Sequence, residues 1–392
     1  MRVGIDCRRI WGNGVSRLTR DFVGGLIDGA PEFDLVLFGD RGELGLWAEQ
    51  GAEVCDYPLA KYSERDIHGL PLIIEAARVD SFLALQYYVS PLIPCRHIRF
   101  LHDTYPFMDG VPLATLEEWR LRYGERDLGL LLTYVRERMP ASTSGQEPDV
   151  QDVYRVLYAE GVERADVVLS VSDSSARRLR ELFPAHAAKI NTVYPFASSK
   201  FHDASGWKGP FDAPWQILHI GNFEPRRNQL SLLQAVESMY RCGVPVTLTL
   251  VGRSTGNYRD YAAQVHAAIG RGVAGGWINY HYWISDDELI DAYCRSAVLV
   301  VPSWCEGFGL PVLEALTLGV PVVAVRSDTL QEVCDTAARW SEPSAESLAR
   351  TLTAVLSEPS IQRGLSQAAL RQSSKYQRDV TVDRLRLALR GF

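Results

Sequence analysis

The sequence lacks any uninterrupted apolar run of the ~20 residues that a membrane-spanning helix needs. It also lacks an excess of positive charge, because 41 Lys and Arg stand against 48 Asp and Glu, a formal net charge of −7. A nucleic-acid-binding protein shows the opposite balance, with a basic patch or stripe. We therefore expect no nucleic-acid partner and no membrane-spanning segment.

Paired cysteine motifs are also missing. The seven cysteines include no Cys-x-x-Cys pair, which argues against a zinc site and for reduced thiols. The opening residues, MRVGIDCRR, lead directly into a predicted strand and do not resemble a signal peptide. We therefore expect the protein to be in the cytoplasm.

Short apolar runs alternate with helical patterns along most of the 392 residues, which is typical of doubly wound α/β folds. Between two such series lies a stretch rich in Pro, Gly, Ser and Asp, which indicates a linker. We predict domains over 1–196 and 215–375 with a linker over 197–214, and a ligand-binding cleft between the domains. The predicted strands are 2–6, 34–39, 80–85, 97–102 and 165–171 in the first domain and 215–221, 245–252, 277–283, 297–301 and 320–325 in the second.

Two carboxylates lie in the segment EGFGLPVLEA, residues 306–315. The segment follows a predicted buried strand and leads into a helix predicted over 311–319, so it is a loop at the carboxyl end of a parallel strand, where open α/β sheets bind ligands. We expect Glu306 in the loop and Glu314 in the first helical turn, both facing one crevice. The alternative is that Glu314 only complements the helix dipole and Glu306 is an ordinary surface acid.

Two adjacent arginines, Arg226 and Arg227, follow the first strand of the second domain. Asn228 then suits the N-cap of the next helix. Each guanidinium can bind a phosphate through two hydrogen bonds, so the pair predicts a diphosphate site, although an isolated arginine pair is often only a solvated surface feature. Nearby carboxylates would accept hydrogen bonds from sugar or ribose hydroxyls, and the combination predicts a sugar nucleotide.

The first turn of the chain, WGNGVSRLTRDF, carries Gly12 and Gly14 but has Arg17 where a dinucleotide loop has its third glycine. That difference disfavours a nicotinamide enzyme. The two glycines fit a tight turn, close approach by a phosphate or sugar, or both.

Several motifs together resemble the retaining GT-B glycosyltransferases of group 1, also called family four, which include bacterial mannosyltransferases. The resemblance implies two Rossmann-like domains facing a central cleft, with the acceptor bound by the N-terminal domain and the last helix, 376–392, returning to that domain. The matching segments are GNGVSRLTRDF, HDTYPF, SVSDSSARRLRELFP, GNFEPRRNQ, ISDDELIDAYCRSAVLVVPSWCEGFGLPVLEAL and KYQRDVTVDRLRLAL.

The resemblance also assigns roles to individual residues. Glu306 would contact the transferred sugar and Glu314 the ribose, while Arg226 and Arg227 would hold the pyrophosphate. Backbone N–H groups around Phe308, Gly309 and Leu310 would bind the phosphate. In the N-terminal domain, Gly14 would lie beside the phosphates and His102 would face the donor sugar. His102 ends a predicted strand, and the alternative is a packed core histidine.

The expected reaction moves a hexose, with mannose first, from a nucleotide diphosphate sugar to a hydroxyl of a glycan or lipid-linked oligosaccharide, with retention. GDP-mannose is the first expected donor and a UDP-sugar the second, on family frequency. No cofactor or metal is expected, because the sequence contains no Asp-x-Asp motif. The setting would be polysaccharide or lipopolysaccharide assembly, with peripheral contact at the inner face of the membrane left open.

Two other interpretations remain. A sugar-nucleotide epimerase or hydrolase would use the same architecture, and a non-catalytic subunit would bind the donor without turnover. The chain also departs from the family pattern in having VYPF at 193–196 and Tyr376 where a tryptophan is usual near the final crossover.

Overall fold

A computed structural model describes residues 1–8, 10, 14–57, 64–85, 90, 92–140 and 146–391. These residues divide into two units, each with its own sheet. Unit 1 holds residues 1–109, 113–196 and 378–392, and unit 2 holds residues 110–112 and 197–377. Gly12, one of the two glycines of the first predicted turn, lies outside the described residues.

Unit 1 is built on a parallel sheet whose seven strands, within the described residues, run in the order β3-β2-β1-β4-β5-β6-β7. Every neighbouring pair of strands is parallel. The strands are β1 (Arg2–Asp6), β2 (Asp34–Gly39), β3 (Glu53–Asp56), β4 (Ser81–Ala84), β5 (Arg96–Leu101), β6 (Val167–Ser170) and β7 (Ile190–Thr192). The α-helices are α1 (Gly14–Gly29), α2 (Gly45–Glu49), α3 (Glu64–Ala76), α4 (Leu116–Tyr123), α5 (Glu125–Arg136), α6 (Val150–Arg164), α7 (Asp173–Leu182) and α16 (Arg378–Arg390).

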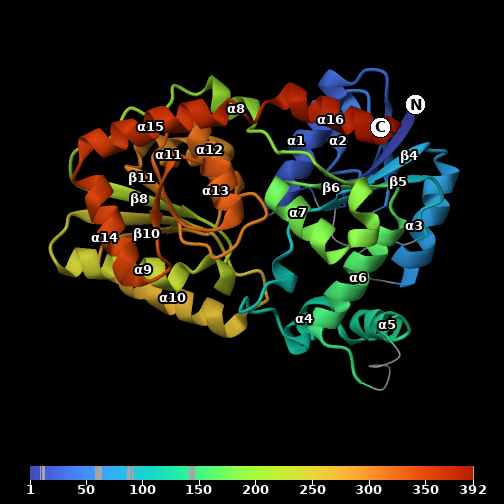
Figure 1. Ribbon diagram of the computed structural model, residues 1–392, viewed down its shortest axis with the longest axis horizontal. Coiled ribbons are helices and arrows are strands. Elements are labelled where there is room, and N and C mark those ends of the chain that lie inside the picture. The colour runs from blue at the N-terminus through green and yellow to red at the C-terminus, as the bar shows by residue number, and fades with distance from the viewer. Residues whose placement is uncertain are drawn as a thin grey trace. The chain divides into compact units, whose positions relative to one another are not determined.

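The last helix of the chain completes unit 1. Figure 1 shows α16 beside α1, although more than 340 residues separate them in the sequence. Its inward face buries Val382, Leu385 and Leu389. The hydroxyl of Ser81 on β4 donates a hydrogen bond to the Leu389 carbonyl over 3.0 Å.

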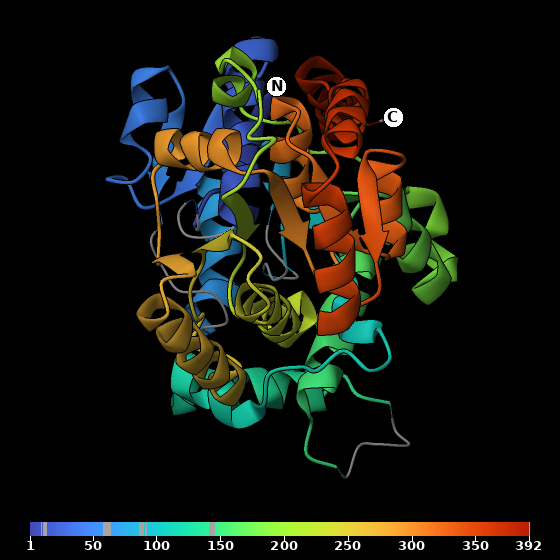
Figure 2. The same ribbon diagram turned by 90° about the vertical axis from the view of Figure 1, so that its left-hand side faces the viewer.

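Unit 2 repeats the same plan with a six-stranded sheet, in the described residues, of order β10-β9-β8-β11-β12-β13. All of its strand pairs are parallel. In the turned view of Figure 2 the early, yellow strands and the later, orange strands belong to this sheet. The strands are β8 (Trp215–Ile220), β9 (Val246–Val251), β10 (Ile278–His281), β11 (Val298–Val301), β12 (Val322–Val325) and β13 (Ala338–Ser341). The α-helices are α8 (Ser199–Asp203), α9 (Gln229–Arg241), α10 (Arg259–Ala274), α11 (Asp286–Arg295), α12 (Leu310–Leu318), α13 (Asp328–Cys334), α14 (Ala345–Leu356) and α15 (Pro359–Ser373).

The predicted doubly wound α/β architecture is confirmed, and every strand expected from the sequence overlaps an observed one. The sequence analysis missed β3, β7 and β13. All three lie at an edge of their sheet and carry partly exposed residues. An edge strand is not buried on both faces, so it lacks the continuous apolar run by which the central strands were found.

None of the helices in the described part of the chain has the length and apolar character that crossing a membrane requires.

Candidate functional site

The loop between β11 and α12 carries the first predicted carboxylate. Helix α12, which follows this loop, has a glycine at each end. Gly309 at the N-cap has a φ of 92°, and Gly319 at the C-cap has a φ of 76°. Glycine adopts such left-handed conformations without the steric cost that a Cβ imposes. The helix therefore runs from Leu310 to Leu318, within one residue of the predicted 311–319 at each end.

Glu306 lies at the centre of a buried ion cluster at the carboxyl end of the unit 2 sheet. Its Oε1 accepts hydrogen bonds from Arg227 Nη1 over 2.8 Å and from Ser303 Oγ over 2.7 Å. Its Oε2 accepts a longer bond, 3.4 Å, from Arg226 Nη1. Glu224 contributes a second carboxylate, 2.8 Å from Arg226 Nε. The structure thus brings Glu306 together with Arg226 and Arg227, although 80 positions separate Arg226 from Glu306 in the sequence.

The charge of Glu306 is held by this cluster. Burial by itself would raise the pKa of the Glu306 carboxyl, but the guanidiniums of Arg227 and Arg226 and the Ser303 hydroxyl hold that pKa below its ordinary value. Its side chain is 6% exposed, against 10% and 20% for Arg226 and Arg227. The site therefore presents an ionised carboxylate between two guanidiniums, which suits the recognition of an anion with hydroxyl groups beside it.

The second carboxylate, Glu314, does not lie in the first turn of α12 as expected from the sequence. The helix starts at Leu310, so Glu314 is its fifth residue. Its side chain is buried and its Oε2 accepts a hydrogen bond from the Tyr293 hydroxyl of α11 over 2.8 Å. This position is too far along the helix for the dipole interaction that was the alternative interpretation.

Two neighbouring expectations are refined by packing. Phe308 is buried, with its ring edge-on to Tyr376 at 5.4 Å, so its side chain anchors the loop. Asn228 occupies the N-cap position of α9 but makes no capping bond, because its side chain instead donates to the Pro343 carbonyl and accepts from Ser231 Oγ.

In unit 1, His102 directly follows β5 and is 6% exposed. Its Nε2 is 2.8 Å from the Leu85 carbonyl, and its ring stacks on Phe100. Gly14, the other residue predicted in this unit, is exposed and starts α1. In this structure, then, His102 is packed at the end of a strand, and any contact with a sugar remains a proposal.

Three polar partners of the predicted residues were not predicted from the sequence: Ser303, Tyr293 and Glu224. Ser303 and Tyr293 carry no sequence signal, because a lone hydroxyl is common in any segment. Glu224 lies two positions before Arg226 and so offered some signal.

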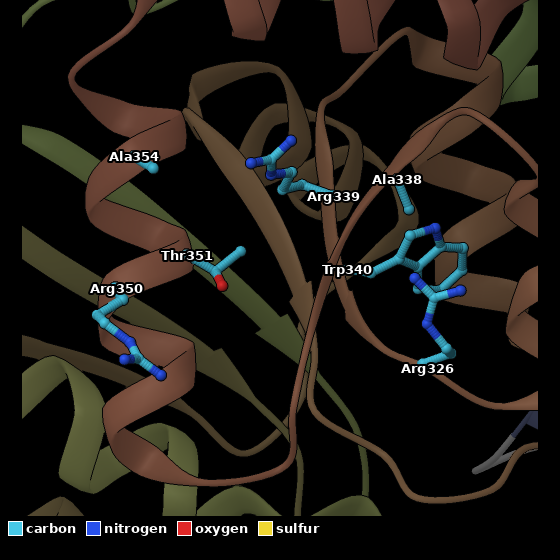
Figure 3. Close-up of a pocket in the computed structure, with 7 residues that line it drawn as sticks. All are labelled: Arg326, Ala338, Arg339, Trp340, Arg350, Thr351 and Ala354. Carbon is cyan, nitrogen blue, oxygen red and sulfur yellow. The ribbon is translucent and has the colours of Figure 1, made fainter.

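The described residues hold no metal site, and one cavity lies away from the ion cluster. No group of three or more His, Cys, Asp or Glu in the described residues is arranged to hold a metal ion. A cavity of about 450 Å³ lies instead at β13 and α14, as Figure 3 shows, with Trp340 beside Arg326. It is lined by Arg326, Ala338, Arg339, Trp340, Arg350, Thr351 and Ala354, and by none of the residues discussed above.

Residues 214–358 match the family model described as "Glycosyl transferases group 1". This range contains the whole Arg226–Arg227–Glu306 cluster. This part of the chain therefore matches the group 1 glycosyltransferase family, in line with the resemblance stated from the sequence.

Relatives with curated descriptions are mannosyltransferases and other glycosyltransferases. The O-antigen chain mannosyltransferase B of Escherichia coli is 32% identical over 212 residues, which are 50% of this chain and 54% of that protein. The serotype-specific mannosyltransferase WbdA of Escherichia coli is 25% identical over 255 residues, covering 63% of this chain and 31% of the relative. The chain thus matches about half or less of the length of these relatives.

Solved structures share the fold. The structure of the Anabaena protein HepE in complex with UDP-glucose aligns with this chain over 100% of each chain, with a TM-score of 0.72 and 15% sequence identity. Sucrose-phosphate synthase from Thermosynechococcus elongatus covers 99% of this chain and 98% of its own with a TM-score of 0.69 at 16% identity. These structures support the GT-B fold class.

Proposed function

We propose that this chain is a retaining hexosyltransferase that moves mannose from GDP-mannose to a hydroxyl of a glycan or lipid-linked acceptor. The observation that carries the proposal is the buried cluster of Arg226, Arg227 and Glu306 at the carboxyl end of the unit 2 sheet. The match of residues 214–358 to the group 1 family supports the reaction class, and the names of the E. coli relatives support mannose and polysaccharide assembly. The UDP-glucose in HepE keeps a UDP-hexose as the second donor to test.

The proposed roles follow from the chemistry of each side chain. Arg226 and Arg227 stabilise the charge that develops on the departing diphosphate, and the first-turn N–H groups of α12 next to Gly309 and Leu310 assist them. Glu306 accepts hydrogen bonds from the transferred sugar, and Glu314 from the ribose. His102 and Gly14 of unit 1 complete the donor contacts, and the acceptor binds to unit 1.

No protein base is required in this scheme, because the departing phosphate takes the proton of the attacking acceptor hydroxyl. No metal is required either, since the arginines supply the positive charge. We place the reaction in the cytoplasm, at the inner face of the membrane where lipid-linked acceptors would be met.

The first test is loss of positive charge. Arg227→Ala and Arg226→Ala should each lower turnover by two to three decades, because removing one such donor costs about 2.7–4 kcal/mol in the barrier. Arg241→Ala is the matched control, since that arginine is exposed on α9 and pairs only with Glu237 among the residues described. Turnover is measured as nucleoside diphosphate released from GDP-mannose or a UDP-hexose with an added mannoside acceptor. Full activity in both site variants would refute the proposed role of the arginines.

Product analysis separates the alternatives. Transfer product that forms only with acceptor, and persists in excess EDTA, supports a metal-independent transferase. Donor consumed equally without acceptor supports an epimerase or hydrolase, and donor binding without turnover supports a non-catalytic subunit.

A further inference from the structure

The two strands that lead to the ion cluster, β8 and β11, are paired over only a short stretch. β8, which precedes Arg226 and Arg227, pairs with β9 over six residues, from Trp215 to Ile220. With β11, which precedes Glu306, it is aligned only at Ile217 and Leu218. Between these two strands the chain order of the sheet reverses, and open α/β sheets bind ligands at such a switch point.

One side chain connects β8 and β11 where their pairing has ended. His219 lies one residue beyond the last aligned pair, Leu218 with Leu299, and its Nδ1 is 3.0 Å from the Val300 carbonyl of β11. A carbonyl oxygen only accepts hydrogen bonds, so Nδ1 must carry the hydrogen and donate it. The ring therefore joins β8 and β11 just beyond their last aligned pair. Further along, a backbone hydrogen bond of 2.8 Å from the Trp304 N–H to the Arg226 carbonyl joins the two loops.

The imidazole of His219 is buried close to the side chain of Arg227. His219 is 1% exposed, and its Nε2 has no hydrogen-bond partner in the part of the chain that the structure describes. A Cβ built on Gly221 would lie 3.4 Å from that Nε2 and 3.1 Å from Cδ of Arg227. The absence of a side chain at Gly221 thus lets the ring and the arginine stem lie close to the same backbone.

We propose that His219 is a positioning residue of the donor site: its hydrogen bond to Val300, together with the backbone bond from Trp304 to Arg226, fixes the separation between the loop that carries Arg226 and Arg227 and the loop that carries Glu306. The residue touches no ligand and acts through the cluster. This inference rests on the proposed function for its effect on nucleotide binding, but not for its effect on the loops.

A matched pair of variants isolates the hydrogen bond. Asn and Leu have similar shapes, but only Asn can donate an N–H from near the position of Nδ1. His219→Leu leaves the buried Val300 carbonyl without its partner, whereas His219→Asn retains one, and both lose the same ring volume. A fall in melting temperature common to both variants therefore reports packing alone.

Two readouts are compared across wild type, His219→Asn and His219→Leu. Hydrogen–deuterium exchange is followed in the loops at 221–229 and 301–309, and GDP and UDP binding is followed by calorimetry. His219→Leu should exchange faster in both loops and bind the preferred nucleotide roughly tenfold more weakly, a change of about 1.4 kcal/mol. His219→Asn should stay within about twofold of wild type in Kd.

The outcomes separate this inference from the proposed function. If wild type binds neither nucleotide, the proposed function fails, and loop exchange still decides the role of His219. If both variants behave alike in both readouts, the positioning role is wrong even where wild type binds GDP. Should His219→Leu not fold, the ¹⁵N shifts of the wild-type imidazole decide: a hydrogen on Nδ1 supports the inference and a hydrogen on Nε2 overturns it.

Discussion

Glu306 bonds to one nitrogen of each guanidinium in the arginine pair. Its carboxylate bonds to Arg226 and Arg227, while Glu224 lies 2.8 Å from Arg226 Nε. Two positive and two negative side chains therefore balance each other, so neither arginine is held as an uncompensated buried charge. The ion pairs also orient both arginines before an anion arrives, which reduces the ordering that binding would otherwise require.

The buried histidines predict how stability depends on pH. Burial lowers the pKa of His219 to about 4, with Arg227 acting in the same direction and the Val300 hydrogen bond and Glu306 acting against it. Burial and the charges of Arg99 and Lys189 lower that of His97 to about 3. The unfolded chain takes up protons near pH 6.5 and the folded chain does not, so this stability is complete above pH 6.5 and lost as pH falls toward 4.

The expected slope is about 1.4 kcal/mol per pH unit for each histidine once the pH is well below 6.5. Urea unfolding at pH 7.5, 6.0 and 5.0 measures it. His219→Asn should flatten the slope for the transition of unit 2 and leave that of unit 1 unchanged. A free energy of unfolding that stays constant from pH 7 to 5 would contradict the prediction.

At the scale of elements, the strand–loop–helix unit around α12 was predicted well because its signals are local. The apolar runs at β11 and β12 and the glycines at both ends of the helix act through neighbouring residues. The sequence predicted that Arg227 and Glu306 share one crevice, but not that they bond directly, nor that Tyr293 bonds to Glu314, because these partners come from other elements. The sequence also left open whether His102 is a sugar contact or a packed core residue, because its neighbours Leu85 and Phe100 are known only from the fold.

Gly319→Ala should destabilise unit 2 by roughly 1–2 kcal/mol, because the φ of 76° is unfavourable for any residue with a Cβ. The new Cβ would also lie 3.2 Å from Leu370 Cγ and from Ser366 Oγ. Gly364→Ala is the control: it is exposed within α15 and a Cβ there meets no atom within 4 Å, so it should stabilise by about 0.5–1 kcal/mol. Chemical denaturation of both variants measures the difference, and equal effects would refute the role of the cap.

At the scale of the whole molecule, the chain leaves unit 1 and later returns to it. Only residues 378–392 after the second sheet belong to unit 1. Thr381 Oγ1 donates to the Tyr194 carbonyl over 2.7 Å, and Arg386 and Arg390 both lie 2.8 Å from Glu32. Unit 1 therefore includes a segment that follows all of unit 2 in the sequence.

Deleting residues 378–392 should lower the melting temperature of unit 1 and leave the transition of unit 2 unchanged, because the deletion exposes the apolar face that α16 covers. Differential scanning calorimetry separates the two transitions. The control is the double variant Arg386→Ala with Arg390→Ala, which removes only partly exposed ion pairs worth roughly 0–1 kcal/mol each. If the double variant destabilises unit 1 as much as the deletion does, burial of α16 is not the main contribution.

The sequence by itself determined the local features of this protein: the central strands, the bounds of α12, and the residue types of a phosphate and sugar site. Buried strands and glycine caps leave these traces because they depend on residues close together in the chain. Only the tertiary structure decided that β8 lies next to β11, which joins Arg226 and Arg227 to Glu306 and lets His219 reach Val300. Strand order in a parallel sheet is set by packing between distant segments, and no short stretch of sequence carries that information.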